Sequence, residues 1–478
     1  MLDETELPSP LLTGHKTVND ILPQTHVQPL AERFSVGKAL RGNCPRSMQA
    51  EWQPPADRAD PVDLLIENSQ GRMEELIPIR YGRMAASPFA FYRGAAAIMA
   101  YDLSHTPVTG LNLQICGDCH LLNFGGFATA ERKLIFDIND FDETSIAPWE
   151  WDLKRLAASF VIAGRSNGFD EVDCREAAWL AAQSYRQSII QYVSMPVLQA
   201  WYEAMDMEQI IANMRDKQMK RFYTKKLDSA KGQSAHEKEF AKLAYTAGEA
   251  PRIIDQPPLI FHYDDTRTAK FRADSEQAIA DYLDSLSPER RVLLSRFELV
   301  DVALKVVGVG SVGTFCGIAL FISGNGDPLF LQFKQARQSV LEPYAGASPF
   351  AHAGRRVVVG QRLMQAASDL FLGWYTGRRG LSLHYYVRQM KDAKIKPVVE
   401  IMEPTNLKGY ATLCGQALAR AHTRSGDAVV LMGYMGKSEA FENALADFSL
   451  AYADQNERDH AALMAAIRSG RVEARMGE

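Results

Sequence analysis

The spacing of hydrophobic and polar residues predicts a mainly helical first half of the chain. Apolar residues there recur every three to four positions, as in helices with one buried face. Two short apolar runs interrupt this pattern and predict strands over residues 111–115 and 134–138. The expected helices cover residues 88–102, 151–164, 171–195, 197–215 and 234–248.

The pattern changes near residue 295, where Val, Gly, Phe and Leu are interrupted by turn residues. Residues 300–334 therefore predict β structure, followed by a helix over 355–369 and a strand over 381–390. Helical spacing returns over residues 407–422 and 439–452. Together these elements predict an α+β protein.

Four regions follow from these changes. Residues 1–60 are rich in Pro, Asn, Thr and Arg without clear periodicity, so an extended arm is expected there. Residues 61–294 are expected to form a helical lobe, and residues 295–400 a smaller β-rich lobe. Residues 401–478 are expected to form a helical segment that packs on the first lobe.

The composition is that of an ordinary globular protein. The chain has 478 residues, of which 46% are hydrophobic, and a net charge of −5, which argues against a dedicated nucleic-acid binder. We see no run of about 18 apolar residues and no signal peptide after Met1, so a cytoplasmic protein without a membrane partner is expected. The six sparse cysteines are expected to stay reduced. The basic stretch at 216–233 indicates a solvated surface or a phosphate-attracting loop.

The residues that point most clearly to chemistry follow the two early strands. Asp118 and Asn123 lie in the first of these loops, and the carboxylates Asp137, Asp140 and Asp142 surround the end of the second strand. Phosphoryl transfer needs a base for the attacking hydroxyl and oxygen ligands for Mg²⁺. Asp118 is the candidate base, and Asn123 and Asp140 are the candidate metal ligands. Asp137 and Asp142 compete with Asp140, and turn formation is the alternative role for these acids.

Other polar residues near these loops leave alternatives open. His120 orients the loop or takes part in catalysis. Cys116 and Cys119 form a C-x-x-C pair, but a structural zinc needs four ligands and no second pair follows, which favours coincidence. Nearby cations are candidates for substrate contacts, for partners of buried carboxylates or for scaffold ion pairs: Arg83, Arg93, Lys154 and Arg155.

A glycine-rich segment in the second half matches G-x-G-x-x-G through Gly308, Gly310 and Gly313, and it includes Ser311. This pattern alone is weak, because dinucleotide-binding folds and kinases both use it. Here a β-branched strand, a turn and a second strand ending in Lys334 follow, which favours a glycine hairpin that covers phosphates. A structural hairpin and a dinucleotide fingerprint remain as alternatives.

Lys334 occupies the position of a kinase lysine that neutralises the nucleotide phosphates. Such a lysine is held by a helix carboxylate, and the nearest candidate is Glu342, which Pro343 follows. The later helix offers only the amides Gln361 and Gln365.

The motifs resemble a known group of enzymes. Gly117-Asp118-x-His120-x-x-Asn123 resembles the catalytic loop of aminoglycoside phosphotransferases, and Asp140-Phe141-Asp142 resembles their metal-binding motif. Asp152 is similar to a later structural aspartate. Residues 80–460 are also similar to a bacterial family of unknown function that is grouped with the protein-kinase-like superfamily. The shared segments include Ser87-Pro88-Phe89-Ala90-Phe91-Tyr92-Arg93-Gly94 and Ala417-Leu418-Ala419-Arg420-Ala421-His422.

This resemblance implies a bilobal protein-kinase-like fold whose lobes are permuted, because the glycine segment and Lys334 follow the catalytic loop. It implies ATP- and Mg²⁺-dependent phosphoryl transfer to a hydroxyl of a small molecule. A nucleotide-binding pseudokinase or interaction module, and a metal-dependent phosphoesterase that uses Asp118 and His120, are the alternatives. Transfer of a nucleotidyl group also stays open.

Overall fold

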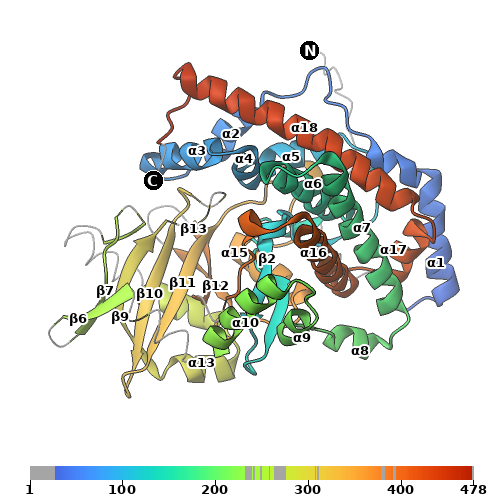
Figure 1. Ribbon diagram of the computed structural model, residues 1–478. Coiled ribbons are helices and arrows are strands. Elements are labelled where there is room, and N and C mark those ends of the chain that lie inside the picture. Colours follow the sequence, from blue (N-terminus) through green and yellow to red (C-terminus); the bar gives the residue numbers. More distant parts are fainter. Residues whose placement is uncertain are drawn as a thin grey trace, which may run out of the picture.

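The computed structural model describes most of the chain. The described residues are 27–231, 240, 243–247, 250–257, 259–262, 276–306, 308, 310, 312–377, 383–390 and 394–475. The chain forms an α+β protein, in which a helical body packs beside an antiparallel sheet (Figure 1). No helix in these ranges has both the length and the apolarity needed to cross a bilayer.

Four long helices form the centre of the helical body. They are α6 (Glu150–Ser166), α7 (Glu171–Val193), α16 (Pro404–Ser425) and α18 (Ala440–Arg468). α16 and α7 approach closely at Gly415, where a Cβ atom would collide with the carbonyl oxygen of Ala181. Trp149 is fully buried and stacks on Tyr185, which fixes the start of α6 against α7. The C-terminal helices thus pack on the region that carries the early motifs.

Shorter helices complete the body. They are α1 (Leu30–Ala39), α2 (Pro61–Ser69), α3 (Ile77–Ala85), α4 (Pro88–Gly94), α5 (Ala96–Ser104), α8 (Val197–Tyr202), α9 (Met207–Ala212), α10 (Lys217–Lys231) and α17 (Ala428–Met435). The helix expected over 88–102 is interrupted at Ala95, whose φ of −102° and ψ of 26° end α4. The stretch expected as one helix over 197–215 is divided into α8 and α9. A helix was expected over 234–248, but residues 244–247 of this stretch form strand β6 (Ala244–Ala247).

The extended arm expected over residues 1–60 is folded over its described part. α1 lies against α17, and a Cβ atom on Gly37 would collide with the carbonyl oxygen of Val430. The side chain of Arg33 donates to Asp427 at 2.6 and 2.8 Å. The glycine permits a close crossing and the ion pair secures it, neither of which is visible in the apolar periodicity.

Two small sheets position the early motifs. β1 (Asn112–Ile115) pairs antiparallel with β4 (Ser145–Pro148). β2 (Phe124–Ala128) pairs with β3 (Leu134–Ile138), which also pairs with β5 (Met205–Asp206). The loop after β1 and the loop after β3 therefore emerge close to each other.

The large sheet has the order β12-β13-β11-β10-β9-β8 and is antiparallel throughout. Its strands are β8 (Ile260–Phe261), β9 (Phe297–Lys305), β10 (Cys316–Ser323), β11 (Pro328–Ala336), β12 (Gly373–Gly377) and β13 (Leu383–Gln389). β6 pairs with β7 (Ala250–Ile253). α13 (Pro288–Leu294) and α15 (Ala353–Met364) pack on the large sheet, whereas α14 (Glu342–Ala345) contacts α5 and β4. The β structure expected over 300–334 and the strand expected over 381–390 are confirmed. The glycine segment joins β9 to β10.

Candidate functional site

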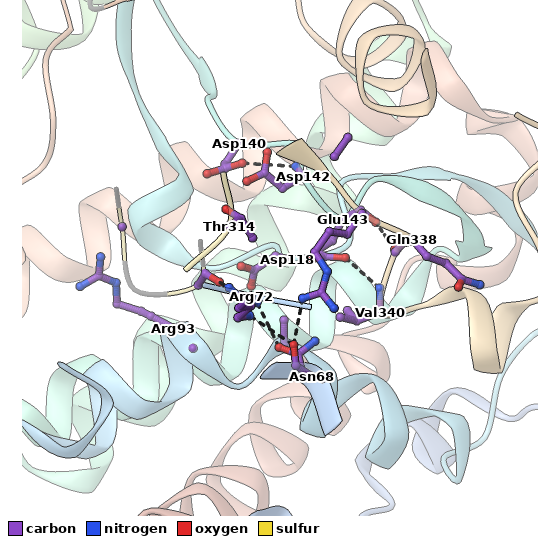
Figure 2. Close-up of a pocket in the computed structure, with 18 of the residues that line it drawn as sticks. Asn68, Arg72, Arg93, Asp118, Asp140, Asp142, Glu143, Thr314, Gln338 and Val340 are labelled. Atoms are coloured by element: carbon purple, nitrogen blue, oxygen red, sulfur yellow. Dashed lines mark hydrogen bonds between the residues drawn. The ribbon is translucent and has the colours of Figure 1, made fainter. Parts of the chain in front are cut away.

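A cavity of about 350 Å³ brings the sequence motifs together (Figure 2). Its wall includes the following predicted site residues: Asp118, His120, Asn123, Asp140, Gly308 and Gly310. Residues from α2 to α5 and the segment after β11 close the other side. Loops far apart in sequence thus share one cavity.

Asp118 is held by a buried arginine of α6. The Arg155 Nε atom donates to Asp118 Oδ1 at 2.6 Å, and Nη2 reaches the same oxygen. The pair fixes the carboxylate and leaves Oδ2 directed toward His120, 3.9 Å away. The loop itself is anchored by Asp152, whose carboxylate accepts from Cys116 N at 2.7 Å and Gly117 N at 2.9 Å. Gly117 has a φ of +82°, a conformation that favours glycine.

His120 orients this loop. Its Nδ1 atom accepts from Leu122 N at 3.2 Å, so the proton of the neutral ring lies on Nε2, toward Asp118. Burial lowers the pKa of His120 to about 3, and the nearby Asp118 carboxylate only partly opposes this. The imidazole is therefore neutral at physiological pH.

Asn123 and Asp140 offer oxygen atoms to a divalent cation. The Asn123 amide nitrogen donates to the Asp118 carbonyl oxygen at 2.6 Å, so Asn123 Oδ1 is the side-chain atom that could face a cation. The Asp140 side chain is 35% exposed and lines the cavity. Desolvation and the neighbouring Asp142 raise the pKa of Asp140, which is the situation that a bound cation relieves. This donor set of carboxylate and amide oxygens fits Mg²⁺.

Lys334 reaches this site from β11. Its Nζ atom lies 3.1 Å from Asp142 Oδ2 and 4.0 Å from Asp140 Oδ2. Burial would raise the pKa of Asp142, but Lys334 and the Tyr386 hydroxyl, which donates to Asp142 Oδ1, lower it to about 2. Burial would likewise lower the pKa of Lys334, and the two carboxylates raise it instead. Lys334 and Asp142 are therefore a charged pair at neutral pH.

The glycine segment forms part of the cavity lining. Gly308 and Gly310 line it, and Gly313 has a φ of +84°. The Gly313 carbonyl accepts from Met73 N at 2.7 Å, which ties the segment to the helical body. Ser311 lies outside the described residues.

The structure does not bring Asp137 or Glu342 to the cavity. Asp137 is fully buried, and its two oxygens accept from Arg420 Nη2 at 2.6 and 2.7 Å. Glu342 accepts from Ser339 N at 3.1 Å and lies 3.7 Å from Arg356. Asp137 is held inside the core, and Glu342 begins α14, bonded to Ser339 N rather than lining the cavity. Asp142 takes the position next to Lys334 that was expected for Glu342.

Several cavity residues were missed by sequence reasoning, and they are Arg72, Arg80, Glu143 and Arg337. They come from α3, from the loop before it and from the segments after β3 and β11. Along the sequence, these residues form no motif that separates them from ordinary charged positions. Only the approach of these segments in space gives them a common location.

The C-x-x-C pair flanks Asp118 in the loop after β1. Ligand atoms of Cys116, Cys119 and Asp152 lie within 4.8 Å of one another, which is the one such cluster among the described residues. Both oxygens of Asp152 already accept backbone N–H groups, and burial raises the pKa of both thiols. A bound metal would itself deprotonate the thiols, so these observations do not test for zinc, and the coincidental pair stays a prediction.

A larger cavity of about 1060 Å³ lies between β2, α9, α10 and α16. Its lining is rich in methionine, with Met205, Met207, Met214, Met219 and Met402. None of the predicted site residues lines it. We therefore place the candidate site in the smaller cavity, where the titratable groups converge.

A comparison of the whole sequence with protein families assigns the chain to one family. The model of an uncharacterised protein conserved in bacteria, DUF2252, matches residues 72–466. The chain belongs to the DUF2252 family. No curated protein and no solved structure matches it. The cavity residues Arg72 to Tyr344 fall within the matched range, so the candidate site is part of the DUF2252 region.

Proposed function

We propose that this DUF2252 protein transfers a phosphoryl group from ATP to a hydroxyl of a small-molecule acceptor, with Mg²⁺ as cofactor. The observation that carries the proposal is the convergence of Lys334, 3.1 Å from Asp142, with Asp118 and Asn123 beneath a glycine segment. Phosphoryl transfer depends on positioning and charge neutralisation, which this combination of groups can supply.

Asp118 is the proposed base. One of its oxygens is anchored by Arg155, so the other has a defined direction. A hydroxyl bound near Asp118 Oδ2 could pass its proton to the carboxylate as the phosphoryl group arrives. Such general-base assistance typically gives about 10² to 10⁴ in rate.

Asn123 and Asp140 would hold Mg²⁺, which when bound neutralises charge on the phosphate oxygens. Lys334 would contact the nucleotide phosphates beside this cation, because its amine lies 4.0 Å from Asp140. Gly308 and Gly310 lack side chains, so the backbone N–H groups of this segment can approach phosphate oxygens.

The sheet also supports a kinase-like lobe. The glycine segment joins β9 to β10, Lys334 lies at the end of the next strand β11, and the helix α15 precedes the returning strands β12 and β13. Protein kinases place a glycine-rich loop and a lysine on the third strand in this relation. Because the catalytic loop comes earlier in this chain, the proposed lobes are permuted.

One observation favours a second candidate, a nucleotide-binding protein without transfer activity. Active protein kinases hold the lysine with a helix glutamate. The α15 sequence contains no acidic residue, and Lys334 is held by Asp142 instead. A pseudokinase could keep this pair as its resting contact.

The test incubates the protein with ATP, Mg²⁺ and a panel of hydroxyl compounds, and it measures ADP formation. The proposal predicts acceptor-dependent ADP that disappears with EDTA. ATP binding without ADP from any acceptor would support the pseudokinase. Hydrolysis of p-nitrophenyl phosphate without ATP, unchanged in Lys334→Ala, would replace the proposal with a phosphoesterase.

A further inference from the structure

Four arginines line the cavity together with the proposed catalytic carboxylates. Arg80 lies on α3 and Arg93 on α4, while Arg72 precedes α3 and Arg337 follows β11. Figure 2 shows Arg72 beside Asn68, Asp140 and Asp142 at the opposite side, and the Arg93 side chain extending to the left. The cavity therefore has an acidic face and a face that we call the arginine face, formed by these four residues.

The arginine face has no carboxylate partners. Within the described part of the chain, none of its four guanidinium groups forms an ion pair within 4 Å. Arg72 donates to the carbonyl oxygens of Gly310 at 2.9 Å and Val312 at 2.7 Å. Arg337 donates to main-chain oxygens of residues 68 and 70 at 2.9 and 2.7 Å. Carbonyl oxygens satisfy hydrogen-bond donors but leave the positive charge uncompensated.

Arg80 is the most buried member, with 1% of its surface exposed. It donates to Ser69 Oγ at 2.7 Å, to Asn68 Oδ1 at 3.0 Å and to Gly94 O at 3.1 Å. Its Nε atom is buried without a hydrogen-bond partner, as is the Nε atom of Arg93. Burial lowers the pKa of Arg80 to about 10, so the group remains charged at neutral pH. A buried cation without a counter-charge is unfavourable, and a bound anion relieves it.

The catalytic carboxylates do not need these arginines. Asp118 is paired with Arg155, and Asp142 is paired with Lys334. Glu143 acts on Arg72 and Arg337 from beyond ion-pair distance, and Asp118 and Glu400 act on Arg93 in the same way. The face therefore carries an excess of positive charge toward the cavity.

We infer that the acceptor carries a negatively charged oxyanion, a phosphate or a carboxylate, which the arginine face binds while the hydroxyl of the acceptor lies toward Asp118. The inference rests on the proposed function and narrows its substrate class. Planar guanidinium groups suit oxyanions because they donate two parallel hydrogen bonds. A polycationic acceptor would be repelled by four arginines.

Binding of the nucleotide by the arginine face is the competing explanation. Arg72 donates to the glycine segment at Gly310 and Val312, so this one member lies next to the proposed phosphate-binding segment. Arg80 and Arg337 are instead hydrogen-bonded to residues 68 to 70 near the end of α2. The two explanations differ in one measurable respect. An acceptor anion binds together with the nucleotide, but an anion that occupies the nucleotide position competes with it.

The experiment uses the full chain and two probes, Mg²⁺ with a non-hydrolysable ATP analogue, and inorganic phosphate. Calorimetry first measures analogue binding alone and then phosphate binding to the analogue-saturated protein. Arg93→Gln is the main variant, because no described hydrogen bond of the fold depends on the Arg93 side chain. Arg93→Lys retains the charge, Arg337→Gln is a second variant, and Arg291→Gln on α13 is the control.

We expect phosphate to bind the analogue-saturated protein. Arg93→Gln and Arg337→Gln should each lower the affinity for phosphate tenfold or more and leave the affinity for the analogue unchanged. Arg93→Lys should recover part of the loss, and Arg291→Gln should behave as wild type. Absence of phosphate binding, competition between phosphate and analogue, or unchanged binding in both Gln variants would overturn the inference. Failure of the analogue to bind wild type would instead refute the proposed function.

Discussion

The Lys334 Nζ atom lies 3.1 Å from an oxygen of Asp142, although 192 residues separate them in the sequence. This contact unites the sheet with the loop after β3, and Asp140 is close to the same amine at 4.0 Å. The lysine is therefore held beside the carboxylate that we propose as a metal ligand. A nucleotide that enters would exchange part of this ion pair for contacts to its phosphates.

Replacement of Lys334 by methionine should weaken the binding of ATP without unfolding the protein. Met keeps the apolar stem of the side chain and removes the charge, together with the contact of the amine with the Tyr386 ring. A charge-assisted contact contributes about 1.5–3 kcal/mol, so affinity should fall roughly 10- to 100-fold. Calorimetric titration with Mg-ATP measures this, and Lys133→Met on an exposed turn is the control. Equal affinities in wild type and Lys334→Met would remove the lysine from the site.

Asp118→Asn should separate chemistry from binding. The amide keeps the size of the carboxylate but cannot accept the acceptor's proton, so kcat should fall about 10²- to 10⁴-fold. Affinity for Mg-ATP should stay within a few-fold of wild type, because other residues bind the nucleotide. The measurement is ADP formation at saturating ATP and acceptor. A normal kcat would show that Asp118 is not the base.

Substitutions of Asp137 and Asp140 should have different effects, although Asp137 lies within β3 and Asp140 only two residues after it. Asp137→Ala leaves Arg420 buried without its partner and should destabilise the protein by roughly 3–5 kcal/mol. Asp137→Ala with Arg420→Met should regain part of this stability. Asp140→Ala should unfold near the wild-type urea midpoint and lose the Mg²⁺-dependent part of ATP binding. A metal-binding defect in Asp137→Ala at full stability would contradict these assignments.

His120 should make stability depend on pH. Its folded pKa of about 3 lies below the unfolded value near 6.5, so the unfolded state binds the extra proton between these values. Stability is therefore fully present above about pH 6.5 and falls as the pH decreases toward 3, by at most about 1.4 kcal/mol per pH unit.

His120→Asn tests this, because an amide oxygen can replace Nδ1 as acceptor for Leu122 N without titrating. Urea unfolding of both proteins at several pH values between 4 and 7 isolates the histidine contribution as a difference in slope. The variant should have the shallower slope. Parallel curves would mean that the ring is already charged or exposed in the folded protein.

Gly310→Ala should affect ligand binding more than folding. A Cβ atom there would meet only the carbonyl oxygen of Arg93, at an ordinary 3.5 Å. If the segment approaches phosphate oxygens, the added methyl group should lower the affinity for ATP severalfold with no loss of folding stability. Gly42→Ala, where a Cβ atom meets nothing within 4 Å, is the control. Thermal shift with and without Mg-ATP reports both quantities, and unchanged ATP affinity would separate the segment from the phosphates.

Local patterns predicted part of this protein well. β3 and α16 lie where apolar periodicity placed them, and Lys334 falls on the strand that the glycine segment led us to expect. These features depend on a few neighbouring residues. The partner of Lys334 was not predictable, because Glu342 is close in sequence while Asp142 is close only after the sheet packs on the loops. The arginine face and the folding of α1 against α17 were missed for the same reason.

The most direct test of the account is a thermal-shift titration of the wild-type protein with ATP and Mg²⁺. A ligand that binds only the folded state must raise the melting temperature, and at about 100 times Kd it adds about 2.7 kcal/mol of stability. We predict a saturable, Mg²⁺-dependent increase that Asp140→Ala and Lys334→Met reduce. No increase at millimolar nucleotide would contradict the claim that this cavity is a nucleotide site.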